Sequence, residues 1–378
     1  MFDYETLRLI WWLLIGVLLI GFAVTDGFDM GAAMLLPLVG KTDTERRVVI
    51  NTLGPHWDGN QVWFITAGGA IFAAWPLVYA TAFSGFYWAM LLVLFALFFR
   101  PVGFEYRSKM AATQWRRSWD MGLSLGSFVP ALVFGVAFGN LFLGVPFQFD
   151  ELTRPTYSGS FWALLNPFAL ICGLTSVAML ALHGAIWLQM RAGGQVTARA
   201  QTYATLLGPA VSGLLLVAGL WLLFAIDGYS ISSAVVGDAA SNPISKTVVR
   251  VDSWFGHFGD YPLLWLLPLI SLIMPVVASR LAAQNKGGWA FLSSAGAITA
   301  IILLAGSTLF PFVMPSSTHL ASSLTLWDAT SSQLTLEIML WVALFFVPLI
   351  LAYTSWSYYK MWRRIEPEFI EQNSVSNY

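Results

Sequence analysis

The stretch Pro-His-Trp-Asp-Gly-Asn-Gln-Val-Trp at residues 55–63 stands at the mouth of a long hydrophobic run. From Gly59 to Phe99 there is no Asp, Glu, Lys, Arg or His, and the next charge is Arg100. Forty-one uncharged residues make two membrane spans of about twenty residues each, with Trp75-Pro76 as the turn between them. Such a hairpin returns the chain to the face it left. We therefore expect Asp58 and Arg100 to lie at one membrane face and to form an ion pair, because an unpaired carboxylate there is costly to desolvate.

The composition indicates a membrane protein. The chain has 378 residues, of which 57% are hydrophobic and 10% are charged, whereas soluble domains carry about 25% charged residues. Lipid offers no partner for backbone groups, so the spans must be helical, and the predicted fold class is all-α and polytopic. We expect one integral membrane domain over 1–378, because the longest loop, 227–262, is too short for a core of its own. The start of the chain lacks the basic region of a signal peptide, so we expect the first span to be retained.

Apolar runs bounded by charges predict about nine spans. They lie near 9–36, 59–75, 79–99, 121–143, 161–190, 203–226, 263–279, 289–312 and 336–359. Fifteen of the 19 Lys and Arg residues fall on one side of this arrangement. The positive-inside rule therefore places the N-terminus outside and the C-terminus in the cytoplasm.

Two carboxylates interrupt the first span. Asp26 and Asp29 are three residues apart, hence on one helix face, near the cytoplasmic third of that span. Intramembrane acids commonly belong to proton paths or face a cofactor, and this reading competes with a polar helix end buried in the bundle. The Asp58–Arg100 pair is open in the same way: it is either structural or the mouth of a proton route.

A second group of charges follows the hairpin. Arg107 and Lys109 fit the positive-inside signal, which does not explain Glu105, and that acid could relay protons. Trp57 and Trp63 are six apart and so lie on different helix faces. Each is either an interfacial anchor or a site residue.

Other kinds of chemistry find little support. A net charge of −1 offers no basic face for a nucleic acid. The lone Cys172 excludes internal disulfides and any multi-Cys metal site. Of the four histidines only His183 lies within a span, which disfavours a self-contained haem or metal site. The motif Phe-Pro-Phe-Val-Met-Pro-Ser-Ser at 310–317 either shapes a quinone cleft or subunit contact, or simply stops a helix before an external loop.

Several long motifs together closely resemble subunit II of cytochrome bd quinol oxidase, most of all its proteobacterial form. The resemblance covers essentially the whole chain, and its matches are long. The motifs are Gly-Phe-Ala-Val-Thr-Asp-Gly-Phe-Asp-Met-Gly at 21–31, the 55–63 stretch, Phe-Phe-Arg-Pro-Val-Gly-Phe-Glu-Tyr-Arg-Ser-Lys at 98–109, the 310–317 motif and Leu-Trp-Asp-Ala-Thr-Ser-Ser-Gln-Leu-Thr-Leu at 326–336.

The resemblance implies a subunit of a terminal oxidase in the bacterial inner membrane that oxidises quinol, reduces O2 to water and builds a proton-motive force without pumping. It implies nine helices as two four-helix bundles plus one peripheral helix. Two b-type haems and one d-type haem would be held by subunit I, and a structural ubiquinone could be bound in this chain. The expected partners are subunit I, a small single-helix accessory subunit, quinol, O2 and membrane lipids. No cofactor-binding residue and no metal ligand is assigned here.

The resemblance also suggests roles for single residues. Asp58 falls at a cytoplasmic proton path, and Asp29, Arg100 and Lys109 match positions linked to haem assembly or proton supply. Trp57 flanks them, and Trp63 matches a residue near a lateral oxygen route. Glu105 stands where the family has Asp, which keeps the acid and changes its reach.

A proton-coupled secondary transporter is the alternative, because broken helices and intramembrane acids fit it too. A transporter needs a substrate site at the membrane midplane. Here the acids crowd one end of the spans instead.

Overall fold

Membrane-length helices make up most of the computed structural model, which describes residues 2–372. Within this part of the chain, eight helices are long and apolar enough to cross a membrane. They are α1 (Tyr4–Val39), α5 (Tyr87–Tyr106, continued by a 3-10 turn to Lys109), α6 (Thr113–Leu143), α7 (Pro167–Arg191), α8 (Gly194–Ala225), α9 (Leu266–Ala283), α10 (Gly287–Leu309) and α11 (Gln333–Met361).

A bent helix pair provides the ninth span. Helices α3 (Trp57–Ala74) and α4 (Pro76–Gly85) are bent by 118° at Trp75, so the chain turns at the predicted Trp75-Pro76, but the bend lies inside this broken span and not between two complete spans. The predicted 79–99 span is wrong in detail, since α4 is a separate helix and α5 begins only at Tyr87. Ser84-Gly85 are weak helix formers, which fits a break at this point.

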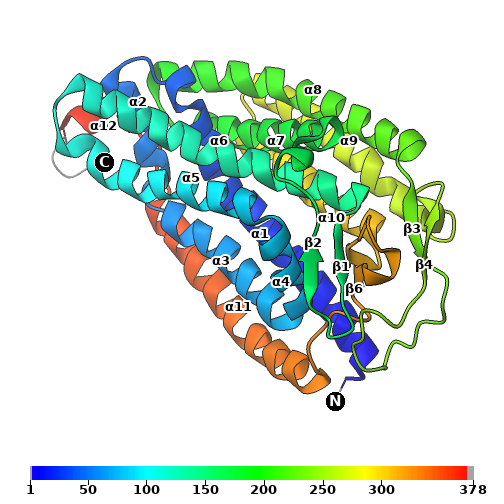
Figure 1. Ribbon diagram of the computed structural model, residues 1–378. Helices are drawn as coiled ribbons and strands as arrows, with labels where there is room; N and C mark the ends of the chain where they lie inside the picture. The colour runs from blue at the N-terminus through cyan, green and yellow to red at the C-terminus, as the bar shows by residue number, and fades with distance from the viewer. Residues whose placement is uncertain (1, 373–378) are drawn as a thin grey trace.

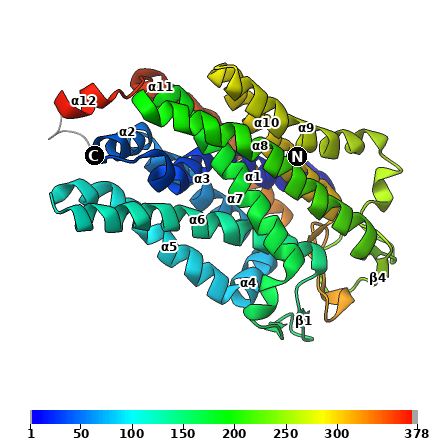
Figure 2. The same cartoon turned by 90° about the horizontal axis from the view of Figure 1, so that it is seen from above.

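The spans form two groups of four, as predicted. Helices α1, α3, α5 and α6 pack together, and α7, α8, α9 and α10 form the second group. Helix α11 packs mainly along α1 and α3, touches α7 near its end, and is the peripheral ninth helix. Figures 1 and 2 show α1 between α6 on one side and α11 on the other. Helix α1 also contacts α7 and α10, so it joins the two bundles.

The crossing of α1 and α7 depends on two glycines. A Cβ added to Gly31 would lie 1.9 Å from the Leu180 carbonyl oxygen, and one added to Gly184 would lie 2.1 Å from the Ala32 nitrogen. Only hydrogen fits at either position. The close approach brings Phe28 of α1 into a stack on Trp187 of α7, with ring centroids 4.0 Å apart.

One end of the bundle carries three small antiparallel sheets that the sequence did not predict. They pair β1 (Phe147–Phe149) with β2 (Pro155–Tyr157), β3 (Gly228–Ile231) with β4 (Val248–Val251), and β5 (Phe312–Met314) with β6 (Leu324–Thr325). The long 227–262 loop packs onto the helices: Tyr229 and Trp254 share a buried cluster with Phe142 and Leu309. Helix α10 ends at Leu309 and β5 follows, so the 310–317 motif does stop a helix.

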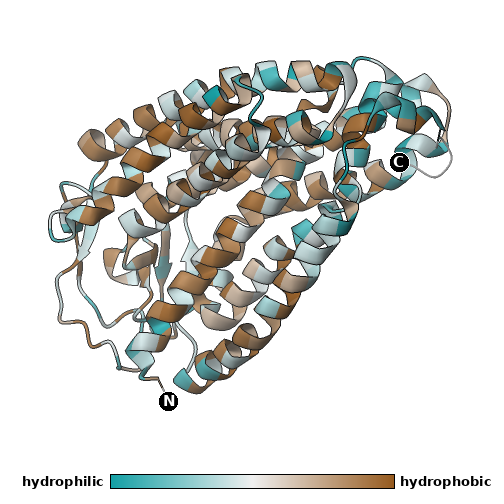
Figure 3. Cartoon of the chain, turned by 180° about the vertical axis from the view of Figure 1, so that it is seen from behind, coloured by the Kyte–Doolittle hydropathy of each residue, from teal (hydrophilic) through white to brown (hydrophobic). Residues whose placement is uncertain are grey.

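The opposite end carries short polar helices. Helix α2 (Asp43–Leu53) starts with a capping box between Thr42 and Glu45, and α12 (Pro367–Gln372) lies beside it. In Figure 3 hydrophilic residues gather at this end, near the C-terminal label, and hydrophobic residues cover the long helices. The N-terminal label lies at the other end of the bundle (Figure 1).

Candidate functional site

A fully buried ion pair joins α1 and α5 inside the bundle. Arg100 donates from Nη1 to Oδ2 of Asp26 at 2.8 Å and from Nη2 to the other carboxylate oxygen. Both side chains are fully buried. A two-pronged guanidinium–carboxylate pair satisfies most of its polar atoms, which is the condition for keeping two charges out of water.

This contact corrects the expected pairing of Asp58 with Arg100. Asp58 lies in the first turn of α3, and its side chain is exposed on the surface of this chain. Arg100 faces α1 instead. Hydropathy gives the depth of a residue along a span but not the rotation of the helix. Rotation decides that Arg100 meets Asp26.

A second carboxylate, Asp29, lies one turn further along α1. Its Oδ2 accepts a hydrogen bond from Nδ2 of Asn60 on α3 at 2.7 Å. The Asn60 Oδ1 in turn accepts from the Tyr358 hydroxyl of α11, also at 2.7 Å. Oδ1 of Asp29 is buried without a hydrogen-bond partner among residues 2–372. The three side chains form a polar connection from the centre of the bundle to its peripheral helix.

His56 continues this connection toward the end of the bundle. Its ring stacks on Tyr358 with centroids 4.0 Å apart and an interplanar angle of 4°. Burial, and then the positive charge of Arg191, lower the pKa of His56 to about 4, so the ring is neutral at pH 7. Its Nε2 has no partner within the described part of the chain.

The two tryptophans differ in their surroundings. Trp57 is buried and stacks on Phe104 with centroids 5.0 Å apart. Trp63 is half-buried, and its ring fills the space beside Gly21 of α1, where an added Cβ would lie 2.6 Å from Cε3. Both pack within the α1–α3–α5 group.

The remaining predicted residues lie on the surface of the chain. Asp58, Glu105 and Lys109 are exposed, and none makes an ion pair within residues 2–372. The structure therefore divides the predicted set. Asp29 belongs to the buried connection and Arg100 to the buried pair with Asp26, whereas these three side chains face outward near the ends of α3 and α5.

Sequence reasoning missed Asn60 and Tyr358. Asn60 stands in the 55–63 stretch itself, and an amide two residues beyond Asp58 at the start of a span was a usable signal. Tyr358 had no comparable signal. It lies 298 positions from Asn60, among other aromatic residues of α11.

His183 is a structural link between three helices. Its Nδ1 lies 2.6 Å from the Ser294 hydroxyl of α10, and its Nε2 lies 3.0 Å from the Val24 carbonyl oxygen of α1. With both ring nitrogens engaged, the imidazole has no free nitrogen for a cofactor.

The sheet-bearing end has its own charged contacts. Lys246 and Asp328 pair at 2.8 Å, and burial raises the pKa of Asp328 and lowers that of Lys246 despite their attraction. Nearby Arg8 is fully buried and donates from Nε to the Thr330 hydroxyl at 2.9 Å. It also donates from Nη2 to the Ala239 carbonyl oxygen at 3.0 Å. These contacts fasten the start of α1 to two loops.

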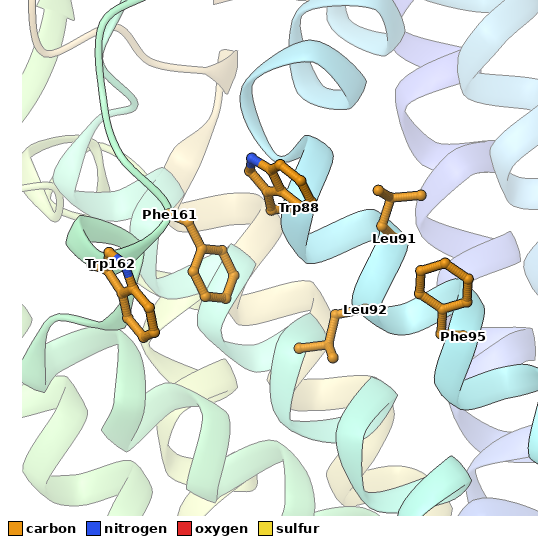
Figure 4. Close-up of a pocket in the computed structure, with 6 residues that line it drawn as sticks. All are labelled: Trp88, Leu91, Leu92, Phe95, Phe161 and Trp162. Atoms are coloured by element: carbon orange, nitrogen blue, oxygen red, sulfur yellow. The ribbon is translucent and has the colours of Figure 1, made fainter.

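An apolar hollow of about 420 Å³ opens beside α5 (Figure 4). Its wall is made of aromatic and leucine side chains only, so it offers no acid, base or nucleophile. The lining residues are Trp88, Leu91, Leu92, Phe95, Phe161 and Trp162.

Comparisons with known proteins agree on one family. The family model described as cytochrome bd terminal oxidase subunit II matches residues 7–361. The chain is 56% identical to cytochrome bd-I ubiquinol oxidase subunit 2 of Escherichia coli K12 over the full length of both. It is 53% identical to a probable cytochrome oxidase subunit 2 of Haemophilus influenzae, again over both full lengths. The cytochrome bd ubiquinol oxidase subunit 2 of Bacillus subtilis is 32% identical over 94% of this chain and 96% of its own length.

A solved structure shares the fold. The bd oxidase of Geobacillus thermodenitrificans superposes with a TM-score of 0.58 at 13% identity, over 98% of this chain and 99% of that chain. The likeness is to oxidase subunits and not to a secondary transporter, so the transporter alternative is set aside.

Proposed function

Because the chain belongs to the cytochrome bd terminal oxidase subunit II family, we propose that it works beside a haem-bearing subunit I to couple quinol oxidation to O2 reduction. Two quinols give up four electrons and four protons and become two quinones. One O2 takes four electrons and four protons and becomes two waters. The names of the Escherichia coli and Bacillus subtilis relatives favour ubiquinol as the substrate.

The histidines of this chain do not fit a haem. Both nitrogens of His183 are engaged, and His56 lies flat against a tyrosine. His257 is bonded through Nε2 to the Ser307 carbonyl oxygen, and His319 through Nδ1 to the Ser322 hydroxyl. These rings are spread over both ends of the bundle. We therefore propose that subunit I holds the two b-type haems and the d-type haem that the family resemblance implies.

The proposed orientation places the N-terminus in the periplasm and the C-terminus in the cytoplasm. Fifteen of the 19 Lys and Arg residues then face the cytoplasm. The buried connection of Asp29, Asn60 and Tyr358 lies toward that side. Taking protons from the cytoplasm matters energetically, because each charge moved against 100 mV costs about 2.3 kcal/mol.

The proposed contribution of this chain is proton supply, and the buried, half-satisfied carboxylate of Asp29 carries that proposal. Its Oδ2 is held by Asn60, so Oδ1 is the free site where a proton can be held or released. Asn60 fixes the rotamer of Asp29 and is itself fixed by Tyr358. The Asp26–Arg100 pair balances the charge close by and leaves Asp29 as the acid without a cation of its own.

Subunit I is proposed to cover the face formed by α3 and α11. Only 11% of the most apolar stretch of helix α11 is buried within this chain, which is the smallest such share among the eight long helices. Helix α3 exposes Asp58 beside open space at Gly59. A carboxylate at this depth is costly in lipid and is better placed against protein or a proton-conducting water path. Asp58 and Glu105 would then collect protons at the subunit boundary, with Lys109 nearby.

Several finer assignments remain proposals that rest on the family resemblance. Trp63, packed beside Gly21, is placed near a lateral route for O2, which needs only an apolar path. On the same resemblance we propose that this chain binds a structural ubiquinone. We also propose that a small single-helix accessory subunit joins the complex.

The proton-supply proposal is tested by two substitutions in the assembled oxidase. We expect Asp29→Asn and Asp58→Asn each to lower quinol-driven O2 uptake per haem by about tenfold or more, in line with the loss of a proton-transfer group. Haem content and the amount of co-purified subunit I should stay near the unsubstituted values. The exposed Asp150→Asn, at the other end of the bundle, is the matched control and should leave uptake unchanged.

Unchanged turnover in both variants, with normal haem content, would mean that this chain only stabilises subunit I. The Asp26–Arg100 pair is the observation that favours such a scaffolding role, because its geometry is fully explained by structure.

A further inference from the structure

A second cavity, of about 470 Å³, lies at the polar end of the bundle, and neither Asp29 nor Asp58 lines it. It opens between the end of α1, the start of α2 and the start of α6. Its charged lining residues are Lys41, Asp43, Arg46, Arg116, Arg117 and Asp120. Figures 1 and 2 show α6 and α11 on opposite sides of α1, so this cavity lies away from the proposed subunit I face.

The two acids in the cavity wall are already neutralised by arginines. Asp120 pairs with Arg46 at 2.9 Å and with the buried Arg107. Asp43 pairs with Arg107 at 2.9 Å and also with Arg116. These ion pairs hold the wall rigid and leave no free carboxylate to repel an anion.

Two cations in the same wall have no carboxylate partner. Lys41 and Arg117 are exposed, and neither forms an ion pair within the part of the chain that the structure describes. The Lys41 ammonium has only a marginal contact with the Pro37 carbonyl oxygen at 3.5 Å. The cavity therefore presents two positive charges without a carboxylate partner, beside a wall whose acids are paired with arginines.

The start of α6 adds to this positive field. Thr113, its first residue, lines the cavity, and no side chain caps this helix start. The first N–H groups of a helix are unsatisfied and carry partial positive charge, so they favour an anion. Trp115 and Trp119, half-buried in the next turns, are the residue type found at the membrane interface.

We propose that this cavity binds the phosphate of an anionic phospholipid headgroup in the cytoplasmic leaflet, with Lys41 and Arg117 as the binding cations. A basic pocket between spans at this depth, flanked by interfacial tryptophans, is suited to a phosphodiester whose acyl chains run along the apolar part of α6. The assignment of the leaflet rests on the proposed orientation, whereas the site itself does not.

The test uses the purified oxidase complex and counts lipids retained after detergent washing by native mass spectrometry. Complexes are first exposed to phosphatidylglycerol or to phosphatidylcholine. The unsubstituted complex should retain one more phosphatidylglycerol than the Lys41→Gln/Arg117→Gln variant, and phosphatidylcholine should show no such difference. Two basic residues near a membrane surface contribute about 1 kcal/mol each, so we expect an affinity for phosphatidylglycerol that is about 30-fold lower in the variant.

The matched control is Arg280→Gln/Lys286→Gln, which removes the same charge from the same side of the membrane at two exposed residues, one in the last turn of α9 and one just before α10. It should retain phosphatidylglycerol like the unsubstituted complex. Equal retention in the Lys41/Arg117 variant would overturn the proposal. Displacement of the lipid by millimolar inorganic phosphate would also overturn it, by assigning the site to a free anion. Normal O2 uptake in the variant would separate this result from any failure of the proton-supply proposal.

Discussion

At the scale of single residues, each polar group in the core is defined by what holds it. Arg100 and Asp26 satisfy each other, so removing either would leave a buried charge and cost about 3–5 kcal/mol. Asp29 is held on one oxygen only, and His56 has no partner at Nε2 within residues 2–372 and stacks by its ring face on Tyr358. Groups held incompletely are the ones free to exchange a proton or respond to pH.

His56 predicts a stability that depends on pH. Its pKa falls from about 6.5 in the unfolded chain to about 4 in the folded protein. The lowered value disfavours the charged form, so stability is complete above pH 6.5 and declines as pH falls toward 4. The loss is about 1–3 kcal/mol. We expect His56→Phe to keep the stack on Tyr358. The thermal unfolding midpoint of the complex should then change less between pH 7 and pH 4.5 than it does in the unsubstituted complex.

The control for that measurement is His257→Phe, at the opposite end of the bundle. It leaves His56 in place and should therefore keep the original pH slope. A His56→Phe complex with an unaltered slope would show that other groups carry the acid sensitivity.

At the scale of elements, the sequence predicted the helices and their turns much better than their rotation. Among residues 2–372, uncharged runs located the long helices apart from the break between α4 and α5, and Trp75-Pro76 located the bend, because lipid forces apolar stretches into helices. The Asp58–Arg100 pairing failed because it needs the angle of α5 about its axis, which tertiary packing sets. The strands failed for another reason. Segments of two to four residues carry almost no periodic signal, and Leu324 finds its partner Met314 only in the folded loop.

The candidate site was predictable to the same limited degree. Asp29 and Arg100 stood out as charges inside apolar runs, which is a property of sequence alone. Tyr358 entered the site only because α11 returns along α3. No local pattern distinguishes that tyrosine from its aromatic neighbours.

The crossing of α1 and α7 gives a prediction for these two elements. Gly31→Ala should lower the free energy of unfolding by about 1–3 kcal/mol, because the added methyl meets backbone atoms that cannot move aside. Gly16→Ala, on the same helix with nothing within 4 Å, is the matched control. It should be neutral or slightly stabilising. Equal effects of the two substitutions would show that helix propensity, and not the crossing, sets the result.

At the scale of the whole molecule, the two bundles and α11 divide the surface into different environments. The face of α3 and α11 is the one proposed to meet subunit I, and α8 lies in the other bundle (Figure 2). Exposed glycines on these two faces therefore report on protein contact and lipid contact respectively.

Gly69→Leu on α3 should reduce the amount of subunit I that co-purifies with this chain by several-fold, because a leucine would stand where a partner helix packs. Gly213→Leu on α8 is the matched control, since both glycines are exposed with nothing within 4 Å. It should leave co-purification unchanged. Full recovery of subunit I with Gly69→Leu would place the interface on another face.

The buried guanidinium of Arg8 finds its acceptors at Ala239 and Thr330, which lie 231 and 322 positions further along the chain. While the ribosome is still producing the middle of the protein, the first helix has no means of completing that contact. The earliest segment to be made is thus among the last to be secured. A nascent chain released before residue 330 would lack the Thr330 hydroxyl, so its first helix would be held to the loops by fewer hydrogen bonds than in the finished protein.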